Sequence, residues 1–182
     1  MAGLLGLLLT LVTFPGVVVH EFAHKVACDW IGVPVLEVRY FRLGNPAGYV
    51  LHLEPERYRQ SFAISVAPFL VNTVLAFAFL VGFATLEAGS GGTEAASAAT
   101  QAATWICLWL GLSIGIHAFP STGDANTLWT RSKAEWRRSP VVLLGLPVVV
   151  LIYVANLLSR LWLDLVYAVG LAFLAVALVG GS

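Results

Sequence analysis

The chain has 182 residues, of which 59% are hydrophobic and only 11% are charged, and its mean hydropathy is +0.86. A soluble domain of this length carries far more charge, so the composition argues against one and predicts an integral membrane protein. Ten basic residues balance ten acidic ones without a Lys/Arg-rich stripe, so nucleic acid is not an expected partner. Both cysteines, Cys28 and Cys107, fall in apolar segments, which argues against a secreted disulfide framework.

The first predicted helix runs from about Gly3 to Trp30. Its apolar run starts at Leu4 without the basic residues that open a signal peptide, so we expect it to be retained as a transmembrane helix. Pro15 should kink this helix near its middle, and Gly32-Val33-Pro34 should end it.

The second half of this helix contains His20-Glu21-Phe22-Ala23-His24, which matches the zinc-protease pattern H-E-x-x-H. Residues i and i+4 share a helix face, so the two histidines can hold one metal ion while Glu21 beside it handles a proton. The structural alternative is a Glu21–Lys25 pair flanked by two packing histidines. Ionisable groups at membrane depth are costly and usually functional, which favours the metal site.

Residues 35–41 and 49–53 are short β-rich runs on either side of the turn-forming sequence Gly44-Asn45-Pro46-Ala47-Gly48. We therefore predict a β-hairpin over residues 35–54. An isolated hairpin is marginal in water, so it should pack against the helices. Its free edge can hold a substrate peptide in an extended conformation, or the hairpin is only a connector, and the sequence leaves both readings open. His52 reads as an ordinary packing or surface histidine.

Three further apolar segments cover about residues 61–86, 102–119 and 140–179. Pro68 and Asn72 interrupt the first of them, and a Gly/Ser/Thr/Ala-rich linker at 87–100 should form a loop. The last segment is long enough for two spans or for one long, tilted or re-entrant helix. We favour two spans, which gives about five transmembrane helices in total.

The basic residues predict the orientation of the chain. The linker at 87–100 contains no Lys or Arg, whereas the other side of the predicted helices carries Lys25, Arg39, Arg42, Arg57, Arg59 and a basic cluster at 131–138. The positive-inside rule therefore puts the N-terminus outside and the hairpin in the cytoplasm. The histidine-bearing end of the first helix and the end of the helix at 102–119 then lie at the same, cytoplasmic side.

A catalytic zinc usually has three protein ligands and one open position, so one ligand beyond the two histidines is needed. Asp124 follows the irregular segment Pro120-Ser121-Thr122-Gly123, where it can turn inward or, alternatively, cap a helix that begins near Ala125. His117 can ligate, hydrogen-bond the third ligand, steady an intermediate, or only pack between helices. Cys28 lies one turn beyond His24 but is more typical of a small buried residue. A His₂-carboxylate set also suits other metals such as iron.

These features resemble the site-2 protease family of intramembrane zinc metalloproteases. The resemblance covers about residues 17–128 and rests on the H-E-x-x-H helix, the β-segment after it, the sequence Ala67-Pro68-Phe69-Leu70-Val71-Asn72 and an aspartate near the cytoplasmic end of the third core helix. It implies zinc held by His20, His24 and Asp124. The family usually has Asn-Pro-Asp-Gly or Leu-Asp-Gly around that aspartate, whereas here glycine precedes Asp124 and alanine follows it.

We therefore predict an all-α polytopic membrane protein with one small cytoplasmic-side β-hairpin between its first and second transmembrane helices. Residues 1–182 should form a single integral membrane domain, with a catalytic three-helix core in 1–130 and C-terminal transmembrane helices in 131–182. The location implied is the plasma membrane of a prokaryote, with the active site near the cytoplasmic face.

The activity implied by the resemblance is hydrolysis of peptide bonds in a transmembrane protein or peptide substrate inside the lipid bilayer. Zinc would activate a water molecule, and Glu21 would act as the general base. Asn72 and His117 are candidates for contacting the substrate or the oxyanion. The alternatives are a metal-binding membrane protein without hydrolytic activity, such as a carrier or a degenerate protease scaffold, and a purely structural membrane protein.

Overall fold

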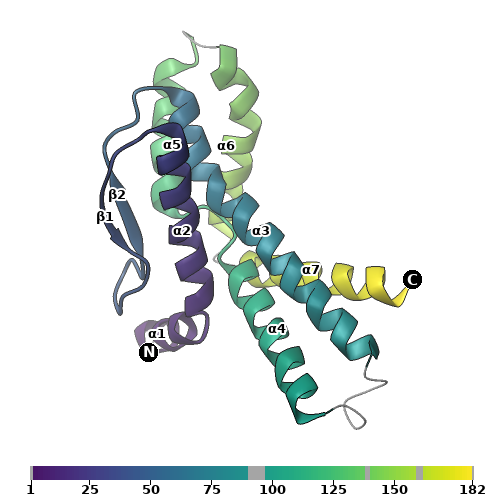
Figure 1. Cartoon of the computed structure of the whole chain (residues 1–182). Coiled ribbons are helices and arrows are strands. Elements are labelled where there is room, and N and C mark those ends of the chain that lie inside the picture. Colours follow the sequence, from purple (N-terminus) through teal and green to yellow (C-terminus); the bar gives the residue numbers. More distant parts are fainter. Residues whose placement is uncertain (1, 90–96, 138–139, 159–161, 182) are drawn as a thin grey trace.

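The computed structural model describes residues 2–89, 97–137, 140–158 and 162–181 (Figure 1). These residues form seven helices and one two-stranded antiparallel sheet, which confirms a largely helical chain with a small hairpin after the H-E-x-x-H segment. Residues 90–96 of the predicted loop at 87–100, and residues 159–161, lie outside the described part. The elements are α1 (Ala2–Val12), α2 (Phe14–Ile31), β1 (Val35–Arg39), β2 (Tyr49–His52), α3 (Tyr58–Gly89), α4 (Ala98–Ile116), α5 (Thr122–Glu135), α6 (Pro140–Leu158) and α7 (Leu163–Gly180).

Three of these helices, α3, α4 and α7, are long and apolar enough to cross a membrane. The bent pair of α1 and α2 makes a fourth span if the two helices are counted together. In α6 the apolar stretch found among the described residues is shorter and covers Gly145–Ala155. The fold is therefore compatible with a membrane location, with three or four candidate spans where the sequence predicted about five. The segment 140–179 contains two helices, α6 and α7, but of the two spans that we favoured there only α7 is a candidate span among the described residues.

The N-terminal helix is broken, not kinked as predicted. The axes of α1 and α2 differ by 75° on either side of Thr13. Pro15 lies in the first turn of α2, a position where its missing N–H costs nothing, so it starts a new helix instead of bending an old one. Side chains of α4 satisfy carbonyl groups freed at the break: the Trp109 indole donates to Val12 at 2.8 Å, and the Ser113 hydroxyl donates to Thr13 at 3.0 Å.

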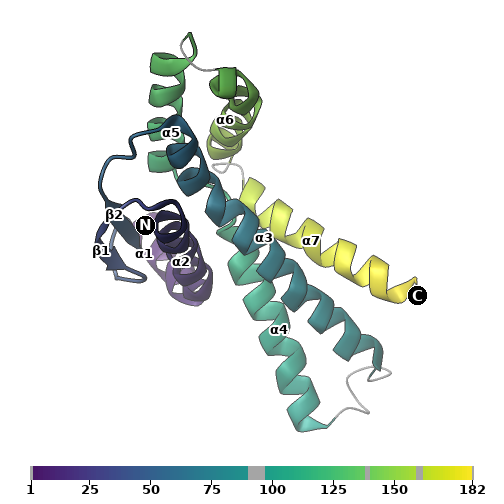
Figure 2. The same ribbon diagram turned by 45° about the horizontal axis from the view of Figure 1, so that its top comes forward.

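Helix α3 is the central element, and α2, α4 and α7 all contact it (Figure 2). Small residues let the helices approach closely. A Cβ atom on Gly16 of α2 would lie 2.0 Å from the carbonyl oxygen of Ser113 on α4, so only glycine fits at this crossing. Between the same helices, the buried Asn72 of α3 donates to the carbonyls of Gly16 and Ile114, both at 3.3 Å. These contacts hold α2 against α3 and α4.

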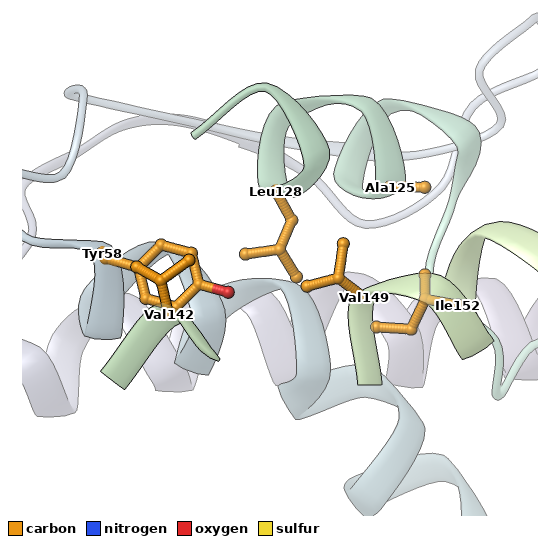
Figure 3. Packing of buried hydrophobic residues seen from close by; sticks show 6 residues of the cluster. All are labelled: Tyr58, Ala125, Leu128, Val142, Val149 and Ile152. Atoms are coloured by element: carbon orange, nitrogen blue, oxygen red, sulfur yellow. The ribbon is translucent and has the colours of Figure 1, made fainter. Parts of the chain in front are cut away.

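Helix α5 is fixed by a separate apolar cluster (Figure 3). Leu128 of α5 is fully buried, and it packs with residues from the start of α3 and from α6. The whole cluster contains Tyr58, Ala125, Leu128, Val142, Val149 and Ile152. This packing positions the N-terminus of α5, and with it Asp124, relative to the other helices.

The predicted hairpin is confirmed, with Val35 opposite His52 and Arg39 opposite Tyr49. Its two strands contact α2, so the sheet runs beside the helix that carries the H-E-x-x-H motif (Figure 1). On the exposed face, the Tyr49 hydroxyl and the Arg39 guanidinium both donate to Glu37, at 2.8 and 3.0 Å. Both contacts lower the pKa of Glu37, and the hydrogen bond from Tyr49 has the larger effect.

Candidate metal centre

Helix α2 presents His20, Glu21 and His24 toward the interior of the protein, and each is only 7 to 8% exposed. The i,i+4 spacing places the two imidazoles on one face, with their Nε2 atoms 3.2 Å apart. Glu21 is the next residue round the helix and lies at the edge of the same face. The arrangement matches the one expected from the H-E-x-x-H pattern.

Each imidazole is oriented by a backbone carbonyl. The Nδ1 atom of His20 lies 2.8 Å from the carbonyl oxygen of His117, and the Nδ1 atom of His24 lies 3.0 Å from that of Ile64. A carbonyl oxygen only accepts hydrogen bonds, so each Nδ1 must carry the proton. In the neutral rings both Nε2 atoms are then unprotonated and present their lone pairs to each other, as in metal-binding histidines with a backbone partner.

Asp124 joins the two histidines from the first turn of α5. Its Oδ2 atom lies 3.4 Å from Nε2 of His24. The same carboxylate accepts hydrogen bonds from the backbone N–H and the hydroxyl of Ser121, which forms a capping box at the start of the helix. The predicted alternative, in which Asp124 caps a helix that begins near Ala125, is wrong in position: α5 begins at Thr122 and its N-cap is Ser121. Asp124 is instead the third helical residue of the capping box, and the same carboxylate lies next to His24.

Asp124 is ionised at neutral pH. Burial raises its pKa, but the positive charge and hydrogen bond of a protonated His24 ring, together with the hydrogen bond from Ser121, outweigh burial and lower the pKa to about 2. The carboxylate therefore needs no deprotonation before it can bind a cation.

The three side chains fit a metal ion. One donor atom from each of His20, His24 and Asp124 lies within 4.8 Å of the others. Two donors bound to the same ion at about 2.0–2.1 Å in a tetrahedral arrangement are about 3.4 Å apart, close to the 3.2 and 3.4 Å seen here. Unless a proton or a metal ion lies between them, three hydrogen-bond acceptors face one another. The group can thus hold a cation, and a His₂-carboxylate set suits zinc or iron.

Two cavities open beside this group. The larger, about 500 Å³, lies between α2, the hairpin and the start of α5, and β2 contributes Tyr49, Val50 and His52 to its wall. A second cavity of about 350 Å³ approaches from the side of α1, α4 and α7. His20 and Glu21 line both cavities. A molecule in either space therefore meets the candidate general base.

The turn of the hairpin lies directly against Glu21. A Cβ atom on Gly48 would be 2.6 Å from Cγ of Glu21 and 3.0 Å from the carbonyl oxygens of Arg39 and Tyr40. Only a residue without a side chain allows this approach. The hairpin is thus in contact with the candidate general base as well as with the rest of α2.

His117 and Asn72, the other two site residues predicted from the sequence, support the centre through hydrogen bonds and are not part of the three-residue group. His117 supplies its carbonyl oxygen to His20, while the Nδ1 atom of its own ring lies 3.0 Å from Ser113 O in α4. Asn72 is fully buried and donates to that same His117 carbonyl at 3.0 Å. Its amide nitrogen faces backbone carbonyls of the helix packing. An oxyanion role for Asn72 or His117 stays a prediction.

Sequence reasoning missed several contributors. Ser121 donates two hydrogen bonds to Asp124, and its signal was the Ser-x-x-Asp spacing that is typical of a helix N-terminus. Gly48 was seen only as a turn residue. His52, read as an ordinary histidine, lines the larger cavity. Cys28 is fully buried in an apolar cluster with Val33 and Ile64, as expected of a small packing residue.

Comparisons of the chain with protein-family models, with curated proteins and with solved structures find no match.

Proposed function

We propose that this chain is an intramembrane metalloprotease of the site-2 protease type, with zinc held by His20, His24 and Asp124. The observation that carries the proposal is the position of Glu21. A carboxylate that is 8% exposed lies beside three convergent acceptors and lines the wall of a cavity in an apolar helical protein. Metal binding alone requires the three acceptors, whereas hydrolysis requires the adjacent base as well.

Each residue has a distinct task in this proposal. When bound, zinc supplies a positive charge that activates water near neutral pH and polarises the scissile carbonyl. Glu21 accepts the proton of the attacking water and delivers it to the leaving amine. The carbonyls of His117 and Ile64 keep the two imidazoles in the orientation that directs Nε2 inward. Ser121 does the same for the Asp124 carboxylate.

The proposed substrate is a transmembrane segment or a membrane-bound peptide. A helical segment has its carbonyls engaged in hydrogen bonds, so it must unwind locally before attack. The larger cavity offers room for such an extended stretch between α2 and the hairpin, and β2 forms one of its walls. Each strand of the two-stranded sheet has one edge without a strand partner in the described residues, which supports pairing of a strand-like substrate with the hairpin.

The test is cleavage of single-span membrane peptides by the purified, zinc-loaded protein, with products identified by mass spectrometry. The proposal predicts cleavage by the wild type and its loss in Glu21→Gln, with zinc content unchanged in that variant. A general base contributes roughly 10²- to 10⁴-fold to the rate. Lys25→Gln, one turn away on the same helix and paired with Asp29 at the surface, is the matched control and should retain activity.

Two outcomes would contradict the proposal. Equal cleavage by the wild type and Glu21→Gln would show that hydrolysis does not use this site. Stoichiometric zinc without cleavage of any peptide in the set would favour a metal-binding membrane protein that has no hydrolytic activity.

A further inference from the structure

Side chains far apart in the sequence meet at the end of the molecule where α3 begins and α5 ends. The Ser132 hydroxyl of α5 donates to the Tyr58 hydroxyl of α3 at 3.1 Å. Next to this contact, Arg131 donates to the carbonyl of Pro55 and to the Ser61 hydroxyl. The first turn of α3 and the last turns of α5 are therefore held together, at the same end as the start of α6 (Figure 1).

Basic residues flank these contacts on both helices. Arg57 and Arg59 lie on either side of Tyr58, and Lys133 follows Ser132; all three are exposed. Arg131 is mostly buried and pairs with Glu135 at 3.5 Å. Within residues 54–59 and 131–137, five basic side chains face three acidic ones, namely Arg57, Arg59, Arg131, Lys133 and Arg137 against Glu54, Glu56 and Glu135.

Tryptophans accompany the charges. The Lys133 ammonium lies 5.6 Å from the centroid of the Trp129 ring, and the Arg137 guanidinium lies 4.8 Å from that of Trp136. Trp136 is 47% exposed. At the end of α2, Trp30 is 88% exposed, and a hydrogen bond of 3.3 Å from Gln60 to the carbonyl of Ile31 keeps that end beside the start of α3.

We propose that this end of the molecule binds the headgroups of anionic phospholipids. We call it the basic-tryptophan end and define it by the residues Trp30, Arg57, Arg59, Trp129, Lys133, Trp136 and Arg137. Tryptophan is enriched where a protein crosses the membrane–water interface, and each Lys or Arg near an anionic surface strengthens attachment. The basic-tryptophan end lies at the start of the candidate span α3 and of the apolar helix α6, which is where a headgroup layer meets membrane helices.

The position of the basic-tryptophan end also predicts the depth of the candidate metal centre in the bilayer. Lys133 lies nine residues after Asp124 on the same helix, and at 1.5 Å per residue this separates them by about 13 Å. Trp30 lies six residues after His24 on α2, or about 9 Å. With the headgroups bound at the basic-tryptophan end, the centre is on the order of 10 Å below them, near one boundary of the bilayer.

The experiment measures lipid selectivity of the full-length protein in phosphatidylcholine bilayers, by electron paramagnetic resonance with spin-labelled phosphatidylglycerol or phosphatidylcholine. We expect the wild type to associate with phosphatidylglycerol several-fold more strongly, and to lose this preference at about 1 M salt, where the screening length falls to about 3 Å. The Lys133→Gln/Arg137→Gln variant should lose most of this several-fold preference, because one Lys or Arg near an anionic surface contributes up to about fivefold. A large excess of inorganic phosphate should not compete.

A second pair, Arg57→Gln/Arg59→Gln, should lower the preference in the same way, and it tests the patch independently if the first pair folds poorly. The matched control is Arg39→Gln/Arg42→Gln in the hairpin, which removes the same charge elsewhere and should keep the preference. Equal association of the two lipids with the wild type would overturn the proposal. An equal loss in the hairpin variant, or no loss in either patch variant, would also overturn it.

Discussion

Replacing Gly48 by alanine tests whether contact with the hairpin positions Glu21. The new methyl group would lie 2.6 Å from Cγ of Glu21, at least about 0.8 Å closer than ordinary carbon contact. The carbonyl oxygens of Arg39 and Tyr40, in the hairpin itself, lie 3.0 Å from the same methyl group. Residue 48 therefore has little room to shift within the hairpin, and we expect the Glu21 side chain to move. A displacement near 1 Å in an active site can cost about 10²-fold. We expect kcat/KM to fall by about 30- to 100-fold, or about 2 to 2.7 kcal/mol.

The assay is cleavage of a quenched-fluorescent single-span peptide by the zinc-loaded variant in detergent micelles. Zinc content should be unchanged, because the three proposed ligands lie on α2 and α5 and not on the hairpin. Gly44→Ala is the matched control from the same hairpin, since its methyl group would meet only the Arg42 side chain at 3.8 Å. If Gly48→Ala retains activity within about threefold of Gly44→Ala, the hairpin does not position the base.

Three further predictions follow from single contacts. Ser121→Ala should weaken zinc binding by about 10- to 100-fold in competition with a chelator, because Asp124 loses the hydroxyl that orients it, whereas Ser121→Thr should restore most of the affinity. Asn72→Leu should lower the free energy of unfolding by about 1–3 kcal/mol in a denaturant titration, because buried carbonyls lose their donor. The pKa of Glu37 is lowered from about 4.5 in the folded hairpin. Its contribution to stability is therefore complete above that unfolded value and is lost as pH falls through the lower folded value. Hydrogen-exchange protection of the hairpin amides should therefore decrease between pH 6 and pH 3, and less so in Tyr49→Phe.

The sequence was most informative where one local pattern determines geometry. The spacing of His20 and His24 places both rings on one helix face in any α-helix, so their convergence could be predicted without a structure. The hairpin was also predictable, because β-rich runs on either side of a Gly- and Pro-containing turn favour antiparallel pairing. Both depend on contacts between residues that are near in sequence.

The sequence was less informative about helix boundaries. Pro15 is compatible with a kink inside a helix and with the first turn of a new one. Helix α4 decides between a kink and a break, because its Trp109 and Ser113 side chains donate to the carbonyls freed at the break from about 100 residues away. Helix α5 was foreseen only as an alternative use of Asp124, because its sequence is polar and carries few of the apolar residues that mark a buried helix.

The choice between Asp124 and His117 could not be made from the sequence, since either residue type suits zinc. The structure brings the Asp124 carboxylate to the two imidazoles, while His117 contributes its backbone carbonyl to His20. A role that is filled by a backbone carbonyl has no sequence signature, because every residue has a backbone carbonyl. The role of Gly48 could not be predicted either, because it depends on the contact between the folded hairpin and Glu21.

The most direct test of the proposed metal centre is the zinc content of the purified protein and two variants, measured by mass spectrometry after dialysis without chelators. We predict about one zinc per chain in the wild type, loss of zinc in Asp124→Ala, and retention in His117→Ala, which keeps the carbonyl that orients His20. Absence of near-stoichiometric metal in the wild type would contradict the account. Loss of zinc in His117→Ala with retention in Asp124→Ala would contradict it equally, because the third ligand would then be His117.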